Sequence, residues 1–331
     1  MRAVVLREFG DVGNAKVDDF PDPEPGPGEV LIRVQAVAAN FVDLLVIGGK
    51  YQFLPDLPFV PGKGPAGIVA GVGRDVTNVS PGDRVLAMAE QGGYGELVTA
   101  PAINVFKLPG SLSFVDAASM SLVYDTAWFA LFERGRLAAG ETALILGASG
   151  GVGYASVQLA KARGAKVLAG LTTPAKASLF DADEIDGVVD LSVENLRDGL
   201  RDQVHALTDG NGVDVVMDPL GDEIFGAAVR ALGWRGRLVV VGFAAGDIPT
   251  LKANYLLLKN IEVSGLQVSD YRKRRPDQMA ECFADVFRLY DEGKIKAAPV
   301  KTFPLQGFAD ALEAISSRRI AGRAILDLSN G

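Results

Sequence analysis

The chain of 331 residues is long enough for two domains, each with its own core, and too long for a disulfide-stapled miniprotein. Hydrophobic residues make up 48% of it and charged residues 22%, which argues against a disordered chain or a fibrous repeat. With 33 Lys and Arg against 41 Asp and Glu, the formal net charge is -8, so the basic field typical of nucleic-acid-binding or lipid-binding proteins is absent.

The chain contains one cysteine, Cys282, and one histidine, His205. A zinc site of four thiolates is therefore impossible, and a catalytic zinc normally takes three protein ligands drawn largely from His and Cys. Apolar spacing predicts a helix at 195–208, with His205 beside polar residues, and a helix at 276–292, with Cys282 on the apolar face. We predict no metal site, a solvated histidine and a buried cysteine.

The sequence lacks the marks of a secreted or membrane protein. Its first residues carry charges around a short hydrophobic stretch, and no later segment approaches the roughly 18 uninterrupted apolar residues of a membrane span. We expect a soluble, cytoplasmic protein with no membrane partner.

Two hydrophobic patterns divide the chain. Residues 1–121 show short strands between Pro and Gly turns, typical of a mostly β domain; the predicted strands are 3–7, 30–38, 67–72, 83–88 and 95–100. Residues 122–265 alternate strands with helices, typical of a parallel sheet covered on both faces; the predicted strands are 142–146, 166–170, 187–190, 213–217 and 237–242. Residues 266–331 should return to the first domain, with further elements at 299–303 (strand), 305–319 (helix) and 323–326 (strand). We predict an α/β protein of two domains.

A glycine-rich loop, GASGGVG at 147–153, follows the predicted strand 142–146 and leads into a helix. This strand–helix–strand setting supports a G-x-G-x-x-G-type match, although Ala148 replaces the first glycine. The second glycine lets backbone N–H groups approach a pyrophosphate, the third lets helix and sheet pack closely, and the helix N-terminus faces the anion. We predict a dinucleotide site that contains Ser149, Gly150, Gly151, Val152 and Gly153. The alternative is a tight turn that binds nothing.

The residues after strand 166–170 favour NADPH over NADH. An NAD-binding protein places Asp or Glu there to bind the ribose 2′-hydroxyl, but no carboxylate follows until Asp181. Thr172, Thr173 and Lys176 are instead placed to accept a 2′-phosphate. The alternative is that the threonines cap the next helix and the lysine is solvated.

Several motifs in order then make a family resemblance visible. They lie at 39–45, 49–51, 58–62, 82–85, 93–96, 124–127, 242–244 and 254–260. Over essentially its whole length the chain closely resembles the zinc-independent quinone oxidoreductases of the medium-chain dehydrogenase/reductase superfamily. The resemblance implies a Rossmann doubly wound parallel sheet domain at 122–265, a mostly β GroES-like catalytic domain at 1–121 and 266–331, and a homodimer joined through the nucleotide domain.

The positions of the superfamily's zinc ligands are also informative. Zinc-dependent members use a Cys, a His-Glu pair and a second Cys, where this sequence has Asn40, Lys63-Gly64 and Leu122. Zinc supports the alkoxide that forms when an ordinary ketone accepts hydride. Quinones and α,β-unsaturated carbonyls spread the incoming electrons over a quinolate or enolate, which a few neutral donors can stabilise. The resemblance therefore implies an acceptor of this kind and no metal.

The resemblance also assigns catalytic positions. It implies that Asn40 and Tyr51 line the cleft facing the nicotinamide, with Asn40 donating to a substrate oxygen or the ribose and Tyr51 orienting the ring or donating a hydrogen bond. Tyr124 would pack near the nicotinamide. The alternatives are a helix cap for Asn40, a loop cover for Tyr51 and a core aromatic for Tyr124. Asp43 fits a first-turn dipole partner better than a catalytic role.

Further cofactor contacts are expected at strand ends. The turn Gly242, Phe243 and Ala244 follows a sheet strand at its carboxyl end, where open α/β sheets bind ligands, so it should meet the carboxamide. By resemblance Asn254 and Arg323 lie near the cofactor, although solvent-facing roles are the alternative for both. The basic run 272–275 is either a solvated loop or a clamp for the phosphates of a CoA thioester.

We therefore expect an NADPH-dependent oxidoreductase that transfers hydride to a quinone without zinc. The first alternative is a C=C reductase for an enoyl thioester or an enone. A hypothesis of a different class is a non-catalytic NADPH-binding sensor or RNA-binding protein, which the acidic charge disfavours. The expected partners are a small-molecule quinone or enone and a second copy of the chain, with no nucleic acid.

Overall fold

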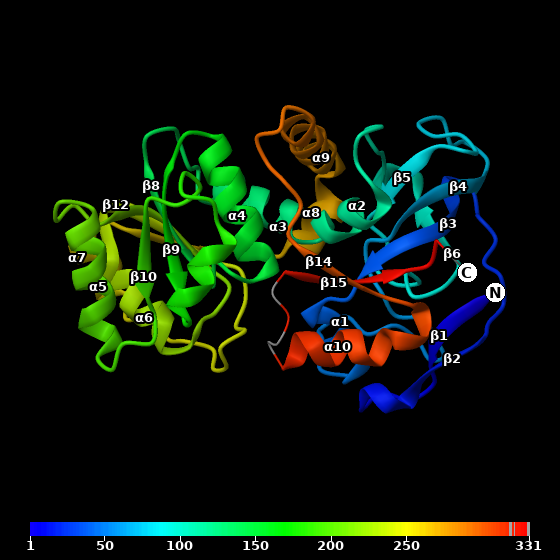
Figure 1. The fold of residues 1–331 in the computed structure, drawn as a ribbon, viewed down its shortest axis with the longest axis horizontal. Helices are drawn as coiled ribbons and strands as arrows, with labels where there is room; N and C mark the ends of the chain where they lie inside the picture. Colours follow the sequence, from blue (N-terminus) through cyan, green and yellow to red (C-terminus); the bar gives the residue numbers. More distant parts are fainter. Residues whose placement is uncertain (318–319, 321, 330–331) are drawn as a thin grey trace. The chain divides into compact units, whose positions relative to one another are not determined.

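The computed structural model describes residues 1–317, 320 and 322–329 and divides the chain into two compact units (Figure 1). Unit 1 comprises Met1–Leu122, Arg274–Asp291 and Ala297–Gly331, and unit 2 comprises Val123–Lys273 and Glu292–Lys296. Residues 266–273 and 292–296, which the sequence analysis assigned to the first domain, thus lie in unit 2.

Unit 2 is built on a six-stranded sheet in which all strands run parallel. The strand order is β10-β9-β8-β11-β12-β13, so it reverses between β8 and β11, as in a doubly wound fold. The strands are β8 (Thr142–Leu146), β9 (Lys166–Leu171), β10 (Gly187–Asp190), β11 (Val213–Asp218), β12 (Leu232–Val240) and β13 (Glu262–Gly265). The predicted fold class is confirmed.

Helices cover this sheet. Figure 1 shows α4 on one side of the strands and α5, α6 and α7 on the other. The elements are α3 (Tyr124–Trp128), the π-helical turn η3 (Phe129–Arg134), α4 (Gly151–Ala162), η4 (Pro174–Leu179), α5 (Leu196–Leu207), α6 (Asp222–Ala231), α7 (Asn254–Lys259) and α8 (Val268–Arg274). Leu196, Leu200 and Val204 of α5 are buried, as the apolar spacing predicts, and His205 is partly exposed.

Unit 1 is mostly β. A seven-stranded sheet runs in the order β14-β15-β3-β4-β5-β7, and β6 pairs with the first half of β3. The strands are β3 (Glu29–Ala38), β4 (Ala66–Val72), β5 (Arg84–Ala87), β6 (Leu97–Pro101), β7 (Val105–Lys107), β14 (Val300–Phe303) and β15 (Arg323–Asp327), with β1 (Arg2–Leu6) and β2 (Ala15–Asp19) as a separate antiparallel pair. β15 and β14 come from the C-terminal part of the chain, so that part returns to the first domain as expected.

Helices and 3-10 turns complete unit 1. They are η1 (Val12–Asn14), α1 (Phe41–Ile47), η2 (Ala102–Asn104), α2 (Phe114–Met120), α9 (Pro276–Asp291), η5 (Leu305–Gly307) and α10 (Phe308–Ser316). The predicted helix 305–319 is therefore a 3-10 turn followed by a shorter α-helix, and its residues 318 and 319 lie outside the described residues. Cys282 on α9 is fully buried, as predicted.

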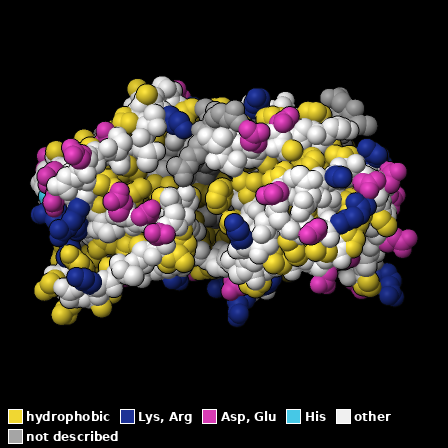
Figure 2. All heavy atoms as spheres, turned by 90° about the horizontal axis from the view of Figure 1, so that it is seen from below, with side chains coloured by type: hydrophobic (Ala, Val, Ile, Leu, Met, Phe, Trp, Pro, Cys, Tyr) yellow, Lys and Arg dark blue, Asp and Glu magenta, His cyan; other side chains and the backbone are white. Residues whose placement is uncertain are grey.

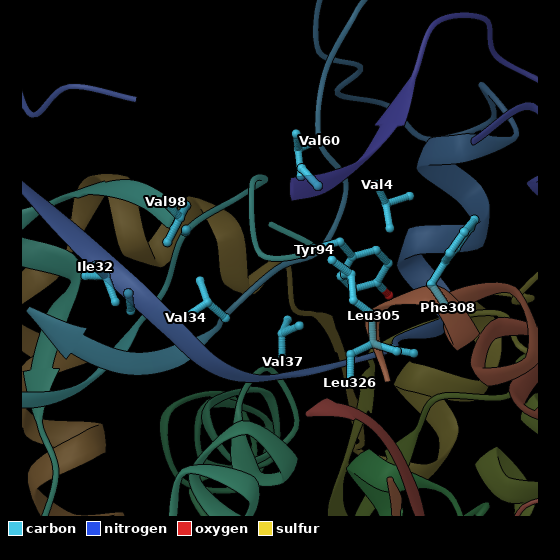
Figure 3. Packing of buried hydrophobic residues seen from close by; sticks show 14 of the residues in the cluster. Val4, Ile32, Val34, Val37, Val60, Tyr94, Val98, Leu305, Phe308 and Leu326 are labelled. Carbon is cyan, nitrogen blue, oxygen red and sulfur yellow. The ribbon is translucent and has the colours of Figure 1, made fainter. Parts of the chain in front are cut away.

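The core of unit 1 surrounds one aromatic side chain that carries a polar group. Figure 3 shows Tyr94 among apolar side chains of several elements, including Val4 of β1, Leu326 of β15 and Phe308 of α10. The Tyr94 side chain is 0% exposed. A buried tyrosine hydroxyl needs a hydrogen-bond partner, and this requirement leads to the candidate site described below.

The described surface carries both signs of charge. On the face drawn in Figure 2, Lys and Arg side chains are interspersed with Asp and Glu. Among the helices of the described residues, none has both the length and the apolar composition needed to cross a bilayer.

Candidate active site and cofactor loop

The glycine-rich loop of unit 2 joins β8 to the N-terminus of α4. Gly147 has a φ of 62°, a left-handed conformation that favours glycine, and Gly150 is the N-cap of α4. A Cβ at Gly153 would collide with the carbonyl oxygen of Gly147, so the helix can approach the strand this closely only with glycine there. The first N–H groups of a helix have no partner within the helix, and here they are available to an anion. The loop therefore fits a dinucleotide pyrophosphate.

The predicted 2′-phosphate site lies where β9 ends. Thr172 and Thr173 directly follow β9 and are exposed, while Lys176 lies in η4 and is partly exposed. The N–H of Lys176 donates to the carbonyl of Thr173 at 2.9 Å, which closes the turn around these residues. Two hydroxyls and one ammonium thus gather in a short exposed segment, a donor set that suits a phosphate.

Two further loops lie at the same edge of the sheet. After β12, the N–H of Ala244 donates to the carbonyl of Pro219 in the loop after β11 at 3.0 Å. A Cβ on Gly147 would lie 3.1 Å from Leu220, so the loops after β8 and β11 are also in contact. Phe243 is 42% exposed. The turn of Gly242, Phe243 and Ala244 therefore belongs to the ligand-binding edge of the sheet, near its switch point.

Asp218, at the end of β11, was not anticipated from the sequence. Its Oδ1 accepts the N–H groups of Leu220 and Gly221 at 2.9 and 3.0 Å. Burial raises the pKa of Asp218, and the two backbone N–H donors oppose that effect. The carboxylate therefore fixes the shape of the loop after β11. An Asp at the end of a predicted strand was the available sequence signal.

Two residues expected near the nicotinamide differ in exposure. Asn254 begins α7 and is exposed. Tyr124 of α3 is 1% exposed, and its hydroxyl donates to the carbonyl of Lys296 at 2.7 Å. Burial raises the pKa of Tyr124 well above its ordinary value. Its surroundings match those of the core aromatic considered as the alternative.

In unit 1, Asn40 belongs to a buried polar cluster at the start of α1, which also contains Asp43, Tyr94 and Arg323. Asn40 is the N-cap of α1, and its backbone N–H donates to Asp43 Oδ2 at 2.8 Å. Tyr94 donates its hydroxyl proton to the same oxygen at 2.8 Å. The cap interpretation of Asn40 and the first-turn position of Asp43 are thus confirmed.

The Asn40 side chain connects α1 with β15. Its Oδ1 accepts a hydrogen bond from the Arg323 guanidinium at 2.7 Å, and its Nδ2 donates to the carbonyl of Ala38 at 2.9 Å. Asn40, expected at a substrate oxygen or the ribose, and Arg323, expected near the cofactor, therefore lie in direct contact. One N–H of the amide serves Ala38, and the Asn40 side chain also hydrogen-bonds the Asp43 carboxylate, so the amide is engaged within the cluster.

Burial dominates the electrostatics of this cluster. Asp43 is 1% exposed, and burial raises its pKa to about 6, while the Tyr94 hydroxyl, the Asn40 N–H and the charge of Lys63 act in the opposite direction. Burial likewise lowers the pKa of Arg323 to about 10, and the negative charge of Asp43 partly restores it. The cluster thus contains one acid, Asp43, and one cation, Arg323, and the negative charge of Asp43 stabilises the positive charge of Arg323 inside the core.

Tyr51, the other expected cleft residue, lies close to a second charged group. The Lys63 ammonium lies over the Tyr51 ring, 5.6 Å from its centroid. Lys63 Nζ also donates to Glu90 Oε2 at 2.7 Å and to the Glu90 carbonyl at 2.8 Å. Sequence reasoning identified Lys63 only as a replacement for a metal ligand, and nothing local indicated its pairing with a residue 27 positions away.

Two of the positions that correspond to zinc ligands, Gly64 and Leu122, lie next to each other, and neither has a ligating side-chain atom. A Cβ at Gly64 would lie 3.5 Å from Leu122 Cγ, so these two positions are adjacent. Within the described part of the chain, no group of three His, Cys, Asp or Glu side chains is arranged to hold a metal ion.

Two residues of the basic run 272–275 form ion pairs with carboxylates. Arg272 is 4% exposed and donates to the buried Asp125 at 2.8 Å. Arg275 pairs with Asp277 at 2.9 Å. Two of the four cations thus have carboxylate partners, which weakens the interpretation of the run as a phosphate clamp.

Comparisons with known proteins agree with this geometry. Residues 151–285 match the zinc-binding dehydrogenase domain family, and residues 26–110 match the alcohol dehydrogenase GroES-like domain family. The chain is 35% identical to a quinone oxidoreductase-like protein 2 homolog of Nematostella vectensis, over 98% of this chain and 88% of that protein.

Two solved structures with NADPH bound are also similar. A mycobacterial protein complexed with NADPH is 30% identical, with a TM-score of 0.90 and 99% of each chain covered. The quinone oxidoreductase of Escherichia coli complexed with NADPH is 26% identical, with a TM-score of 0.88 and coverage of 99% of this chain and 100% of that chain.

Proposed function

Because the chain belongs to the quinone oxidoreductase family of the medium-chain dehydrogenase/reductase superfamily, we propose that it reduces quinones with NADPH and without a metal ion. The chain is an oxidoreductase, and its cofactor is NADPH.

The residues after β9 support the preference for the phosphorylated cofactor. Thr172, Thr173 and Lys176 offer two hydroxyls and a cation to a 2′-phosphate. The glycine-rich loop offers the N–H groups of Gly151, Val152 and Gly153 to the pyrophosphate, with Ser149 beside them. The turn 242–244 and Asn254 would bind the nicotinamide half. When bound, NADPH supplies the hydride.

The observation that carries the metal-free proposal is the character of the residues at the zinc positions. Asn40 is held by Arg323 and Ala38, Lys63 is paired with Glu90, and Gly64 and Leu122 have no ligating atom in their side chains. A quinone suits such a site because its electrons are delocalised after hydride addition, so groups such as Asn40 and Tyr51 can stabilise the product without a metal ion. Quinone, NADPH and one proton become hydroquinone and NADP+, and the proton comes from solvent or a cleft hydroxyl.

Turnover with two acceptors tests this proposal. We expect the protein to oxidise NADPH with 1,4-benzoquinone, without loss of rate after exhaustive chelation, and to leave crotonyl-CoA unreduced. Elemental analysis of the same sample should find no stoichiometric zinc. Consumption of crotonyl-CoA alone would instead favour the enoyl thioester reductase, and NADPH binding without turnover of any acceptor would favour a sensor.

We further propose that two copies associate through unit 2. β13 is an outer strand of the six-stranded sheet, and outer strands leave backbone groups available for pairing. The preceding helix α7 exposes Leu257 (78%) and Leu258 (72%). Neighbouring exposed leucines next to a sheet edge suit a second copy of the same chain.

A further inference from the structure

Lys63 is a buried cation whose position the fold of unit 1 fixes closely. It is 7% exposed. It lies between Gly62 (φ 93°) and Gly64 (φ 65°), both in conformations that favour glycine. A Cβ at Gly62 would collide with the Tyr94 ring, and a Cβ at Gly64 would collide with Ser121. The backbone that carries the lysine therefore has little freedom.

Two contacts hold the ammonium at its end. Nζ donates to both the carboxylate and the backbone carbonyl of Glu90, at 2.7 and 2.8 Å. An ammonium has three N–H donors, and these contacts use two of them. Moving a charge out of water costs several kcal/mol of desolvation free energy, and a partner offsets only part of it. An apolar side chain would fill the same space with a smaller penalty, so packing alone does not explain a lysine here.

The third side of the ammonium is the side of Tyr51. Nζ lies 5.6 Å from the centroid of that ring, and Tyr51 is partly exposed. Phe53, whose ring centroid is 6.4 Å from that of Tyr51, is 53% exposed. An aromatic surface thus borders a fixed positive charge, which is a suitable environment for a flat aromatic molecule with an anionic oxygen.

We propose that Lys63 is a catalytic residue that stabilises the negative charge formed on the acceptor oxygen. This inference rests on the proposed function. When the quinone accepts hydride it becomes the hydroquinone monoanion, and the ammonium of Lys63 interacts with that anionic oxygen. A proton from solvent then completes the hydroquinone, so Lys63 ends the cycle with its own proton. Glu90 is a positioning residue that holds Nζ toward Tyr51.

A phenolate probe tests the charge without turnover. We would titrate 4-nitrophenol by absorbance in the presence of the protein without cofactor, because its phenolate resembles the hydroquinone monoanion. Lys63 should lower the pKa of the bound probe by about one unit or more. In Lys63→Met this shift should disappear, whereas Lys63→Arg should retain most of it. Because no hydride is transferred, this result is independent of whether the protein reduces quinones.

Glu90→Gln is a second variant, and it should change the pKa of the bound probe in the direction opposite to Lys63→Met. It keeps a side-chain oxygen for Nζ but removes a negative charge, so the pKa of the bound probe should fall further than in the wild type. A purely structural role of the pair would move both variants in the same direction, through a common loss of packing. Equal probe shifts in wild type, Lys63→Met and Glu90→Gln would overturn the proposal, as would shifts of the same sign in both variants.

Kinetics with 1,4-benzoquinone provide the second readout. Lys63→Met should lower kcat about 10- to 100-fold, since the lost contact forms with charge that develops in the transition state, while the Kd for NADPH changes less than twofold. Lys107→Met, which removes the partner of Asp83 in the same unit, is the matched control and should keep the wild-type kcat. If the wild type reduces the quinone and Lys63→Met has the same kcat, the catalytic role of Lys63 is wrong.

Discussion

At the scale of single residues, Asp43 shows how an N-cap can extend into a buried network. One oxygen of this carboxylate accepts both the backbone N–H of Asn40 and the hydroxyl of Tyr94, and the Arg323 guanidinium binds the amide of Asn40. The start of α1, the loop that carries Tyr94 and the start of β15 are thereby joined. These partners fix the orientation of the Asn40 amide.

The raised pKa of Asp43 predicts that the fold loses stability as the pH rises. Its pKa is 3.8 in the unfolded chain and about 6 in the fold, so the folded state binds the proton more tightly. The stabilising contribution is complete below pH 3.8 and is lost as the pH rises through about 6. In Asp43→Asn, the free energy of unfolding relative to wild type should therefore rise between about pH 4 and pH 7, by up to about 3 kcal/mol.

Urea unfolding at several pH values measures this difference. Asp202→Asn, an exposed position on α5, is the control and should follow the wild-type pH dependence. A difference between Asp43→Asn and wild type that stays constant over the same range would show that Asp43 does not titrate differently in the fold.

Lys176 carries the second prediction at this scale. If its ammonium contacts the 2′-phosphate, Lys176→Ala should weaken NADPH binding about 10-fold and leave NADH binding unchanged, because one charge-assisted contact is lost. Lys166→Ala, at the opposite end of β9, is the matched control. Fluorescence titration with both cofactors gives the ratio of the Kd for NADH to the Kd for NADPH. The same ratio in Lys176→Ala as in wild type would exclude the contact.

Residue-level sequence reasoning was successful where the signal was local. The Asn-x-x-Asp spacing predicts the cap at α1, and apolar spacing predicts the burial of Cys282. The pairs Tyr94–Asp43 and Lys63–Glu90 span 51 and 27 positions. Such pairs depend on how the strands of unit 1 are arranged, and no periodicity in one sequence specifies that arrangement.

At the scale of elements, the approach of α4 to β8 depends on Gly153. Replacing it with alanine places a Cβ against the carbonyl of Gly147, so the helix must shift and its N-terminal N–H groups with it. Gly153→Ala should cost about 1–3 kcal/mol of stability and weaken NADPH binding at least 10-fold.

Gly226→Ala is the matched control for this helix substitution. It lies in α6 of the same unit, and a Cβ there would meet nothing within 4 Å. Because alanine is the better helix former, this variant should gain about 0.5–1 kcal/mol and bind NADPH normally. Urea unfolding and cofactor titration measure both effects. Normal NADPH binding by Gly153→Ala would mean that the loop does not hold the pyrophosphate.

Five of the six strands of unit 2 were predicted, because each contains a short apolar run, and β13, with the sequence EVSG, was missed. β8 and β10 coincide with the predicted ranges 142–146 and 187–190. β12 begins at Leu232 rather than 237, since a stretch with two glycines and the 74%-exposed Trp234 gives no apolar run. β2 was missed for a similar reason: KVDD, its last four residues, contains one apolar residue and pairs only with β1. Strands at the surface need a partner that sequence patterns do not reveal.

For the whole molecule, the proposed dimer gives a direct test. Replacing Leu257 and Leu258 together with Glu places charge on the exposed face of α7 and should convert the dimer to a monomer in sedimentation experiments. Ile103→Glu, 58% exposed in unit 1, is the control and should leave the dimer intact. A wild-type chain that sediments as a monomer at micromolar concentration would contradict the proposal.

If the protein reduces quinones as proposed, the complete burial of Cys282 has a chemical consequence. Quinones are electrophiles that add to accessible thiolates, and the accessibility of a cysteine largely determines whether it is arylated. The only thiol of this chain lies in α9, and the next residue, Phe283, packs against Phe106 and Phe287. Under the proposed function, the fold offers the quinone no thiol at its surface, so the acceptor does not arylate the protein.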